Sequence, residues 1–144
     1  MVKRRIGLLG GTFDPIHFGH LLLAEEVRVA LPLERVLFVP AGQPPHKLDE
    51  PHTEPAHRLR MLELAIADNP GFGISRVDID RPGPHYSFDM VRLVQAELGA
   101  EVELFFLMGL DSLATILTWR MPERLPNQRA NQADPFIESI YHRS

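Results

Sequence analysis

The stretch from Ile6 to His20 constrains the fold of this chain more than any other part of the sequence. It reads I-G-L-L-G-G-T-F-D-P-I-H-F-G-H, so that a short apolar run ends at two adjacent glycines. Such a run predicts a buried strand followed by a turn in which the backbone closely approaches another group. Apolar residues at helical spacing come next and predict a helix that begins near Phe18 or Gly19. We therefore expect a strand, a glycine turn and a helix in immediate succession.

Two histidines, His17 and His20, lie beside the start of this predicted helix. A helix N-terminus presents unpaired N–H groups and the positive end of the helix dipole, which together stabilise a bound anion. Two imidazoles three residues apart lie on the same side of a helical turn, and both can donate hydrogen bonds to phosphate oxygens. The glycines match neither the P-loop pattern nor the G-x-G-x-x-G pattern. The stretch therefore predicts a phosphate site of a different type.

Two other interpretations of the stretch remain open. In the first, the histidines only cap the helix and the glycines only turn the chain. In the second, the close histidine pair binds zinc, since the chain has 7 histidines. The chain has no cysteine and no H-E-x-x-H motif, which are common features of zinc sites. We therefore assign no metal ligand.

Composition and charge limit the classes of protein that the chain can belong to. Its 144 residues, of which 44% are hydrophobic, predict one compact domain with no room for a second. The lack of cysteine fits a reducing compartment, so we expect a cytoplasmic protein. A formal net charge of −4 gives no basic surface for nucleic acid, and no apolar stretch reaches membrane-spanning length. We therefore expect neither a nucleic acid nor a membrane as a partner. The oligomeric state stays open.

Strand and helix patterns alternate along the rest of the chain. Residues 35–39 predict a second strand, and the proline-rich segment 40–55 predicts a loop. Thr53 is placed to cap a helix over about residues 55–68, and a weaker strand pattern covers residues 72–80. These elements predict a second strand–helix–strand unit.

The same alternation continues in the second half. Ser87 is placed to cap a helix that Gly99 ends, and residues 103–108 predict a fourth main strand. Asp111 and Ser112 then predict the start of a short helix. The fold class that we predict is α/β, a doubly wound Rossmann-like parallel sheet with helices on both faces.

Ligands of such sheets bind at the carboxyl ends of the strands. Three glycine-containing segments fall at these ends, and they are residues 10–11, 40–42 and 109–111. We therefore expect the phosphate site at this edge of the sheet.

Residues Gly10 to His20 carry a resemblance to a known family. The form G-G-T-F-D-P-I-H-F-G-H resembles the T/H-x-G-H signature of the nucleotidyltransferase superfamily and, more closely, the bacterial nicotinate-nucleotide adenylyltransferases. Residues 40–47 are similar to the P-x-x-x-P-P-H-K loop of that family, and residues 81–89 to its R-x-G-x-S-Y-T-x-D segment. Residues 109–113, followed by Trp119, are similar to G-x-D-S-L…W.

The resemblance implies a set of site residues and a reaction. The phosphate of nicotinate mononucleotide attacks the α-phosphorus of ATP, giving nicotinate adenine dinucleotide and pyrophosphate, with Mg²⁺ accompanying ATP. The implied catalytic residues are His17, His20 and Lys47. The implied ATP-binding residues are Gly10, Gly11, Thr12, Phe13, His17, His20, Gly109 and Asp111. The implied nicotinate mononucleotide-binding residues are His46, Lys47, Tyr86, Ser87 and Trp119.

The resemblance covers about residues 4–125 and stops there. Family members continue with an I-S-S-T-x-I-R type motif that holds ATP phosphates, and this chain contains no such motif. We therefore expect a C-terminally shortened nucleotidyltransferase domain over residues 1–125 and an atypical polar tail over 126–144. Within that tail, residues 136–141 have the only strand-like pattern.

Three classes of function are consistent with these features. The first is an active nicotinate-nucleotide adenylyltransferase or a related enzyme, such as pantetheine-phosphate adenylyltransferase or a cytidylyltransferase. The second is a catalytically impaired remnant that binds nucleotide, which the missing C-terminal motif suggests. The third, a structural protein without a nucleotide site, has the least support in the sequence.

Overall fold

A computed structural model describes residues 3–42, 53–81, 87–110, 113–120 and 136–143 of the chain. Along the chain its elements are β1 (Arg5–Gly11), α1 (Phe18–Ala30), β2 (Arg35–Pro40), α2 (Pro55–Ile66), β3 (Phe72–Ile74), α3 (Ser87–Leu98), β4 (Glu103–Leu110), β5 (Leu113–Arg120) and β6 (Phe136–Arg143). None of the helices in these segments is long and apolar enough to cross a membrane.

The strands form a single sheet in the order β3-β2-β1-β4-β5-β6. β1 pairs in parallel with β2 and with β4, and β2 pairs in parallel with β3. The antiparallel strands β5 and β6 extend the sheet beyond β4. The order 3-2-1-4 of the parallel strands is that of a Rossmann-like half-sheet, so the predicted fold class is confirmed.

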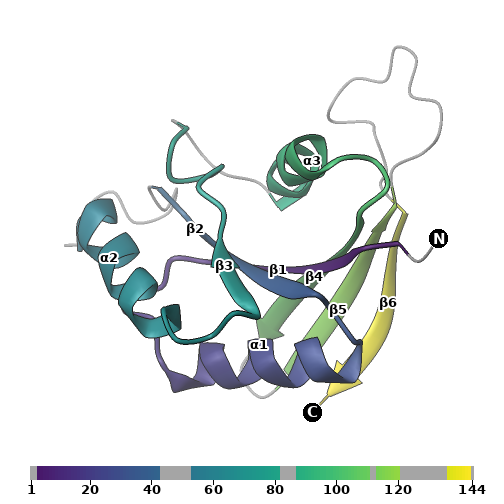
Figure 1. Cartoon of the computed structure of the whole chain (residues 1–144), viewed down its shortest axis with the longest axis horizontal. Coiled ribbons are helices and arrows are strands. Elements are labelled where there is room, and N and C mark those ends of the chain that lie inside the picture. The colour runs from purple at the N-terminus through teal and green to yellow at the C-terminus, as the bar shows by residue number, and fades with distance from the viewer. Residues whose placement is uncertain (1–2, 43–52, 82–86, 111–112, 121–135, 144) are drawn as a thin grey trace.

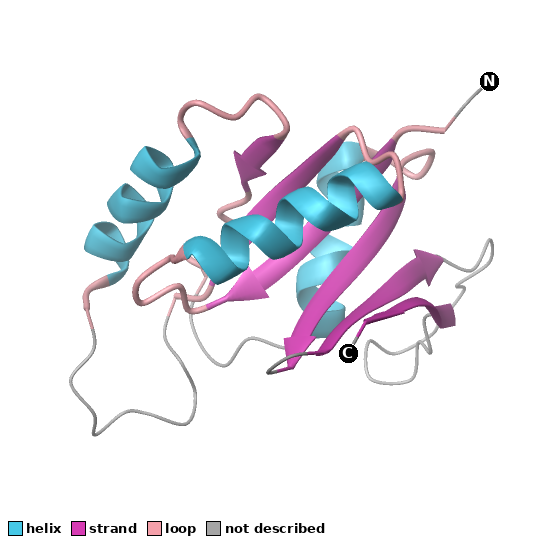
Figure 2. Cartoon of the chain, turned by 90° about the horizontal axis from the view of Figure 1, so that it is seen from below, coloured by secondary structure: helices cyan, strands magenta, loops and turns pink. Residues whose placement is uncertain are grey.

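The helices cover both faces of the sheet (Figures 1 and 2), with α1 and α2 on one face and α3 on the other. Neighbouring residues of β1 show the division, because side chains alternate between faces along a strand. Leu9 belongs to a hydrophobic cluster with Val27 of α1 and Leu62 of α2. Leu8 belongs to a second cluster with Val94 of α3. A sheet buried on both faces explains why the β1 and β2 sequences are almost continuously apolar.

The start of α1 and the end of α3 agree with the sequence predictions. α1 begins at Phe18, with His17 as its N-cap residue. Gly99 follows α3 with a φ of +107°, in the left-handed region that glycine adopts without steric cost. Its N–H donates to the Gln95 carbonyl oxygen at 2.9 Å. α3 itself begins at Ser87.

Three predicted elements differ from the structure. The residue that caps α2 is Glu54 rather than Thr53, and it makes no side-chain cap hydrogen bond. The backbone of Thr53 is used otherwise, because its N–H donates to the Asp14 carboxylate at 3.2 Å. The third strand ends at Ile74 rather than near residue 80, since residues 77–80 form a turn. The Asp80 N–H donates to the Arg76 carbonyl in that turn.

The third difference is the short helix predicted after Asp111 and Ser112, which is wrong. Residues Leu113–Arg120 form β5, which pairs antiparallel with β4 from Leu110↔Leu113 onward. Only two residues connect the strands, and a two-residue connection favours a hairpin. The segment also contains three β-branched residues, Thr115, Ile116 and Thr118, and β-branched residues favour strands over helices.

The strand-like pattern at residues 136–141 corresponds to β6, which spans Phe136–Arg143. It pairs with β5 through seven residue pairs, with an irregularity between Ile116 and Leu117. A strand therefore lies within the segment for which we expected a polar tail.

Candidate phosphate-binding site

The loops that follow β1 and β2 lie side by side at the carboxyl edge of the sheet. Gly11, the last residue of β1, pairs with Pro40, the last residue of β2. The Ala41 N–H continues the ladder by donating to the Gly11 carbonyl oxygen at 2.9 Å. The glycine turn and the start of the 40–42 segment are thereby fixed to each other, as expected of a ligand-binding edge.

His17 and His20 form a reciprocal cap at the start of α1. The Gly19 N–H donates to Nδ1 of His17 at 3.0 Å, and the His17 N–H donates to Nδ1 of His20 at 3.2 Å. The two rings are stacked, with centroids 3.8 Å apart and an interplanar angle of 28°. The prediction that the two histidines lie together at the helix start is confirmed, and so is the capping role that remained open.

The cap determines which nitrogen of each ring carries the proton. Since each Nδ1 accepts a backbone N–H, the proton of the neutral ring resides on Nε2. Each imidazole therefore presents an Nε2–H donor of the kind that binds phosphate oxygens. The two helix-start N–H groups of His17 and Gly19 are occupied by the rings, so these two groups are not available to an anion.

Burial lowers the pKa of His20, and the neighbouring His17 lowers it further. The neutral ring is therefore favoured, and a neutral ring can donate from Nε2 while its Nδ1 keeps the cap. His20 is half-buried because its ring packs against Phe13, with centroids 5.0 Å apart in an edge-to-face arrangement.

Phe13 connects the histidine pair to the hydrophobic core. Its side chain is buried, packs edge-to-face on Phe38 at 5.7 Å, and belongs to the same cluster as α1 and α2. Its φ of +51° lies in the left-handed region, which is unusual for a bulky residue. A Cβ atom on Gly11 would lie 3.2 Å from the Phe13 ring, so glycine at this position leaves room for the ring.

Arg58 in α2 is a part of the site that the sequence prediction missed. Its side chain is buried, with 1% relative exposure, and it donates to backbone carbonyl oxygens of both loops. The position could have been noticed, because Arg58 lies four residues before Leu62 and eight before Ile66, on the inward face of the predicted helix.

The remaining predicted residues are not all brought together. His46, Lys47, Tyr86 and Asp111 lie outside the described residues. Gly109 lies at the carboxyl end of β4, the same edge as Gly11.

Trp119 lies elsewhere in the sheet. It pairs with Leu104, which in turn pairs with Ile6 near the other end of β1. Five residues separate Ile6 from Gly11, a distance on the order of 15 Å along a strand. The sheet register therefore does not bring Trp119 together with the histidine pair.

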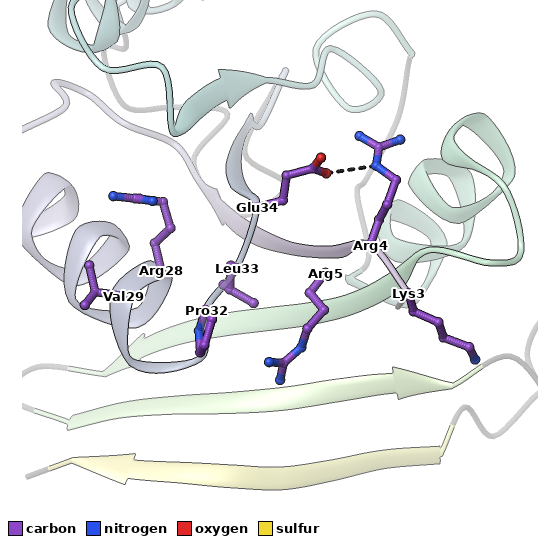
Figure 3. Close-up of a pocket in the computed structure, with 8 residues that line it drawn as sticks. All are labelled: Lys3, Arg4, Arg5, Arg28, Val29, Pro32, Leu33 and Glu34. Atoms are coloured by element: carbon purple, nitrogen blue, oxygen red, sulfur yellow. Dashed lines mark hydrogen bonds and ion pairs between the residues drawn. The ribbon is translucent and has the colours of Figure 1, made fainter. Parts of the chain in front are cut away.

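A pocket of about 510 Å³ lies at the opposite, amino edge of the sheet (Figure 3). It is lined by basic residues that include Lys3, Arg4, Arg5 and Arg28, and by none of the predicted site residues. The arginines have carboxylate partners in the described structure. Arg4 pairs with Glu34 at 2.9 Å, Arg28 with Glu25 at 2.5 Å and Arg5 with Glu103 at 4.0 Å. These ion pairs neutralise part of the positive charge of the arginines that line the pocket.

Within the described segments, no group of three or more His, Cys, Asp or Glu residues is arranged to hold a metal ion. Asp14 lies in the loop after β1, where its carboxylate accepts the Thr53 N–H and interacts with the Arg58 charge. The imidazole Nε2–H groups at this edge are hydrogen-bond donors, which suit phosphate oxygens.

Residues 8–136 match the model of the cytidylyltransferase-like family. The chain belongs to this family. Two curated members resemble it closely, and each is named "Probable nicotinate-nucleotide adenylyltransferase". The protein of Thermomicrobium roseum is 55% identical over 121 residues, covering 84% of this chain and 56% of that protein. The protein of Roseiflexus sp. is 52% identical over 125 residues, covering 87% of this chain and 62% of that protein.

The resemblance found from the sequence motifs is confirmed by these relatives, and the chain spans little more than half of their length. A solved structure with the same fold is Plasmodium falciparum nicotinic acid mononucleotide adenylyltransferase complexed with NaAD. It has a TM-score of 0.55 at 20% identity and covers 72% of this chain and 50% of that one. The chain thus shares its Rossmann-like fold with this protein.

Proposed function

We propose that the protein transfers the adenylyl group of ATP to nicotinate mononucleotide, giving nicotinate adenine dinucleotide and pyrophosphate. The observation that carries the proposal is the reciprocal His17–His20 cap at the carboxyl edge of the sheet, which leaves an Nε2–H donor on each ring. The substrate assignment is supported by the names of the relatives and by the motifs in residues 40–47 and 81–89.

The reaction needs positioning and charge stabilisation rather than a general base. The attacking phosphate oxygen of nicotinate mononucleotide is already ionised, so no proton has to be removed from it. It forms a bond to the α-phosphorus of ATP while the bond to the β-phosphate oxygen breaks and pyrophosphate leaves. His17 and His20 donate from Nε2 to phosphate oxygens on which charge develops, and the cap holds both rings in place before the substrate binds.

Lys47 is proposed as a further catalytic cation, because a mobile ammonium group suits a polyphosphate. Gly10 and Gly11 at the end of β1, with Thr12 and Phe13 in the loop after it, are proposed to lie beneath the ATP phosphates. Gly109 and Asp111 are proposed for the ribose side. His46, Lys47, Tyr86, Ser87 and Trp119 are proposed for nicotinate mononucleotide. Trp119 has the least geometric support, because its strand register places it far from Gly11.

Mg²⁺ is proposed to enter with ATP and to neutralise part of the phosphate charge. Such an ion keeps several waters and needs few protein ligands when phosphates bind it. The nitrogen donors at the edge fit the phosphates that would carry the ion, and we assign no protein ligand to it. We also propose a cytoplasmic protein with a nucleotidyltransferase domain over residues 1–125.

A second candidate is a nucleotide-binding protein with impaired catalysis. It keeps nucleotide binding at the carboxyl edge of the sheet and lacks efficient turnover. Loss of one phosphate donor from such a site costs on the order of 10²- to 10³-fold in rate.

One assay separates the two candidates. The purified chain is incubated with ATP, Mg²⁺ and nicotinate mononucleotide, and the dinucleotide is measured by mass spectrometry. Product with nicotinate but not nicotinamide mononucleotide supports the first candidate. ATP binding without product supports the second, and no ATP binding at all contradicts both.

A further inference from the structure

Arg58 is one of the largest fully buried side chains in the described structure, although it carries a charge. Buried arginines are rare, since removing a guanidinium from water is costly unless its donors are satisfied. Burial accordingly lowers the pKa of Arg58, an effect that the nearby Asp14 opposes. An apolar residue at this inward position of α2 would fill the space without that cost, so the charge calls for an explanation other than packing.

The hydrogen bonds of Arg58 provide that explanation. Nη1 donates to the Thr12 carbonyl oxygen at 2.7 Å and to that of Ala41 at 2.8 Å. Nη2 donates to the Gly42 carbonyl oxygen at 2.8 Å, and Nε donates to that of Thr53 at 3.1 Å. One planar group therefore joins the backbone after β1, the backbone after β2 and the segment that leads into α2.

These contacts lead directly to the histidine pair. Thr12 immediately precedes Phe13, whose ring packs against His20. The loop is held a second time at Asp14, whose carboxylate accepts the N–H of Thr53, and the Thr53 carbonyl accepts from Arg58. The position of the loop between β1 and α1 therefore depends on the guanidinium from two sides.

We propose that Arg58 is a positioning residue for the phosphate site, which holds the loop after β1 against the loop after β2 without contacting substrate itself. This inference rests on the proposed adenylyl transfer. Lysine cannot replace it, because a single ammonium group lacks the planar fork of five N–H donors that reaches several carbonyls at once.

The test uses the full-length chain and three variants. Arg58→Lys keeps a cation at the position, and Arg58→Met keeps an unbranched side chain without donors. Arg60→Met is the matched control on the same helix. The Arg60 side chain is exposed, and its Nη1 forms an ion pair with the Glu63 carboxylate at 3.7 Å. Steady-state kinetics at 20 °C and hydrogen–deuterium exchange are measured for each variant whose circular dichroism matches that of the unmodified chain.

Arg58→Lys is expected to lower kcat by about 10- to 100-fold while each KM changes by less than about threefold, because misplaced phosphate donors affect the transition state most. Arg60→Met is expected to retain kcat within about twofold. Unchanged kcat in Arg58→Lys would overturn the proposal. If Arg58→Met does not fold, Arg58→Lys alone decides.

Hydrogen–deuterium exchange tests the positioning independently of activity. Both Arg58 variants are expected to exchange faster in peptides that cover residues 11–16 and 41–42, with β4 unchanged. Unchanged exchange in these peptides, or an equal increase in all peptides, would refute a local positioning role. An unmodified chain that makes no dinucleotide would contradict the proposed function, whereas the exchange result would still decide the role of Arg58.

Discussion

The two ends of the parallel strands use arginine in different ways. At the carboxyl edge, buried Arg58 donates hydrogen bonds to the backbone carbonyl oxygens of separate loops. Among the described residues, these acceptors include no carboxylate. At the amino edge, Arg4 and Arg28 are partly exposed and pair with Glu34 and Glu25. Exposed ion pairs contribute little to stability and neutralise each other. The contrast indicates that Arg58 holds backbone in place at the carboxyl edge, whereas Arg4 and Arg28 bind carboxylates at the amino edge.

The largest effect is expected from Phe13, which anchors the carboxyl edge in the core. Phe13→Ala removes a buried ring that packs on Phe38 and His20, and should lower the free energy of unfolding by about 3–5 kcal/mol. The control is Phe18→Ala, five residues later, because the Phe18 side chain is 87% exposed. Urea unfolding measures the free energy of unfolding of both variants. Similar losses in the two variants would contradict the anchoring role.

The next effect separates capping from phosphate binding at His17. His17→Asn keeps a good N-cap acceptor but removes the Nε2–H donor, so the unfolding midpoint should be retained. Adenylyl transfer should fall by about 10²- to 10³-fold, as for the loss of one transition-state donor. Full turnover of this variant in the dinucleotide assay would show that His17 only caps the helix.

A smaller effect is expected at the amino edge. Arg4→Ala removes the exposed ion pair with Glu34 and should change the free energy of unfolding by less than about 1 kcal/mol. It should also leave the kcat of adenylyl transfer unchanged, since Arg4 lies at the other end of the strands from the histidines. A large fall in kcat, measured under the same conditions as for His17→Asn, would mean that the amino edge takes part in the reaction.

The smallest effect concerns pH. The folded-state pKa of His20 lies below its ordinary value of 6.5, so the unfolded chain binds more protons at this residue between the two values. The free energy of unfolding should therefore rise with pH through that window, and the stabilisation should be lost as the pH falls through the folded-state pKa.

Urea unfolding between pH 5 and pH 8 measures this dependence. The reference variant is His20→Gln, because glutamine at the same helix position can also accept the N-cap N–H. The slope should be shallower in the variant, and equal slopes would exclude His20 as a source of the pH dependence.

Much of the fold could be predicted from local patterns. The strand at residues 35–39, the helix start beside His17 and the helix end at Gly99 follow from side-chain type and spacing alone. The parallel order of the main strands follows from their alternation with helices. The histidine pair was also predictable, since residues three apart at a helix start must be neighbours.

Other features depend on contacts between distant segments. The role of Arg58 is set by carbonyl groups up to 46 residues away, which no local pattern contains. The identity of β5 as a strand depends on its pairing with β4, and a helix start signal at Asp111 and Ser112 favoured the wrong element. The hydrogen bonds from the Gly19 and His17 N–H groups to Nδ1 of His17 and His20 could not be predicted either, because they depend on ring orientations.

The reciprocal cap makes the same two histidines responsible for the start of α1 and for the proposed phosphate binding. Each ring accepts an N–H group at the start of the same helix, so folding of α1 and the proposed recognition of phosphate draw on the same pair of side chains. Selection for a well-formed helix alone does not preserve histidine at position 17, because asparagine also caps a helix well. Retention of both histidines in a related sequence would therefore point to a role of the pair beyond capping.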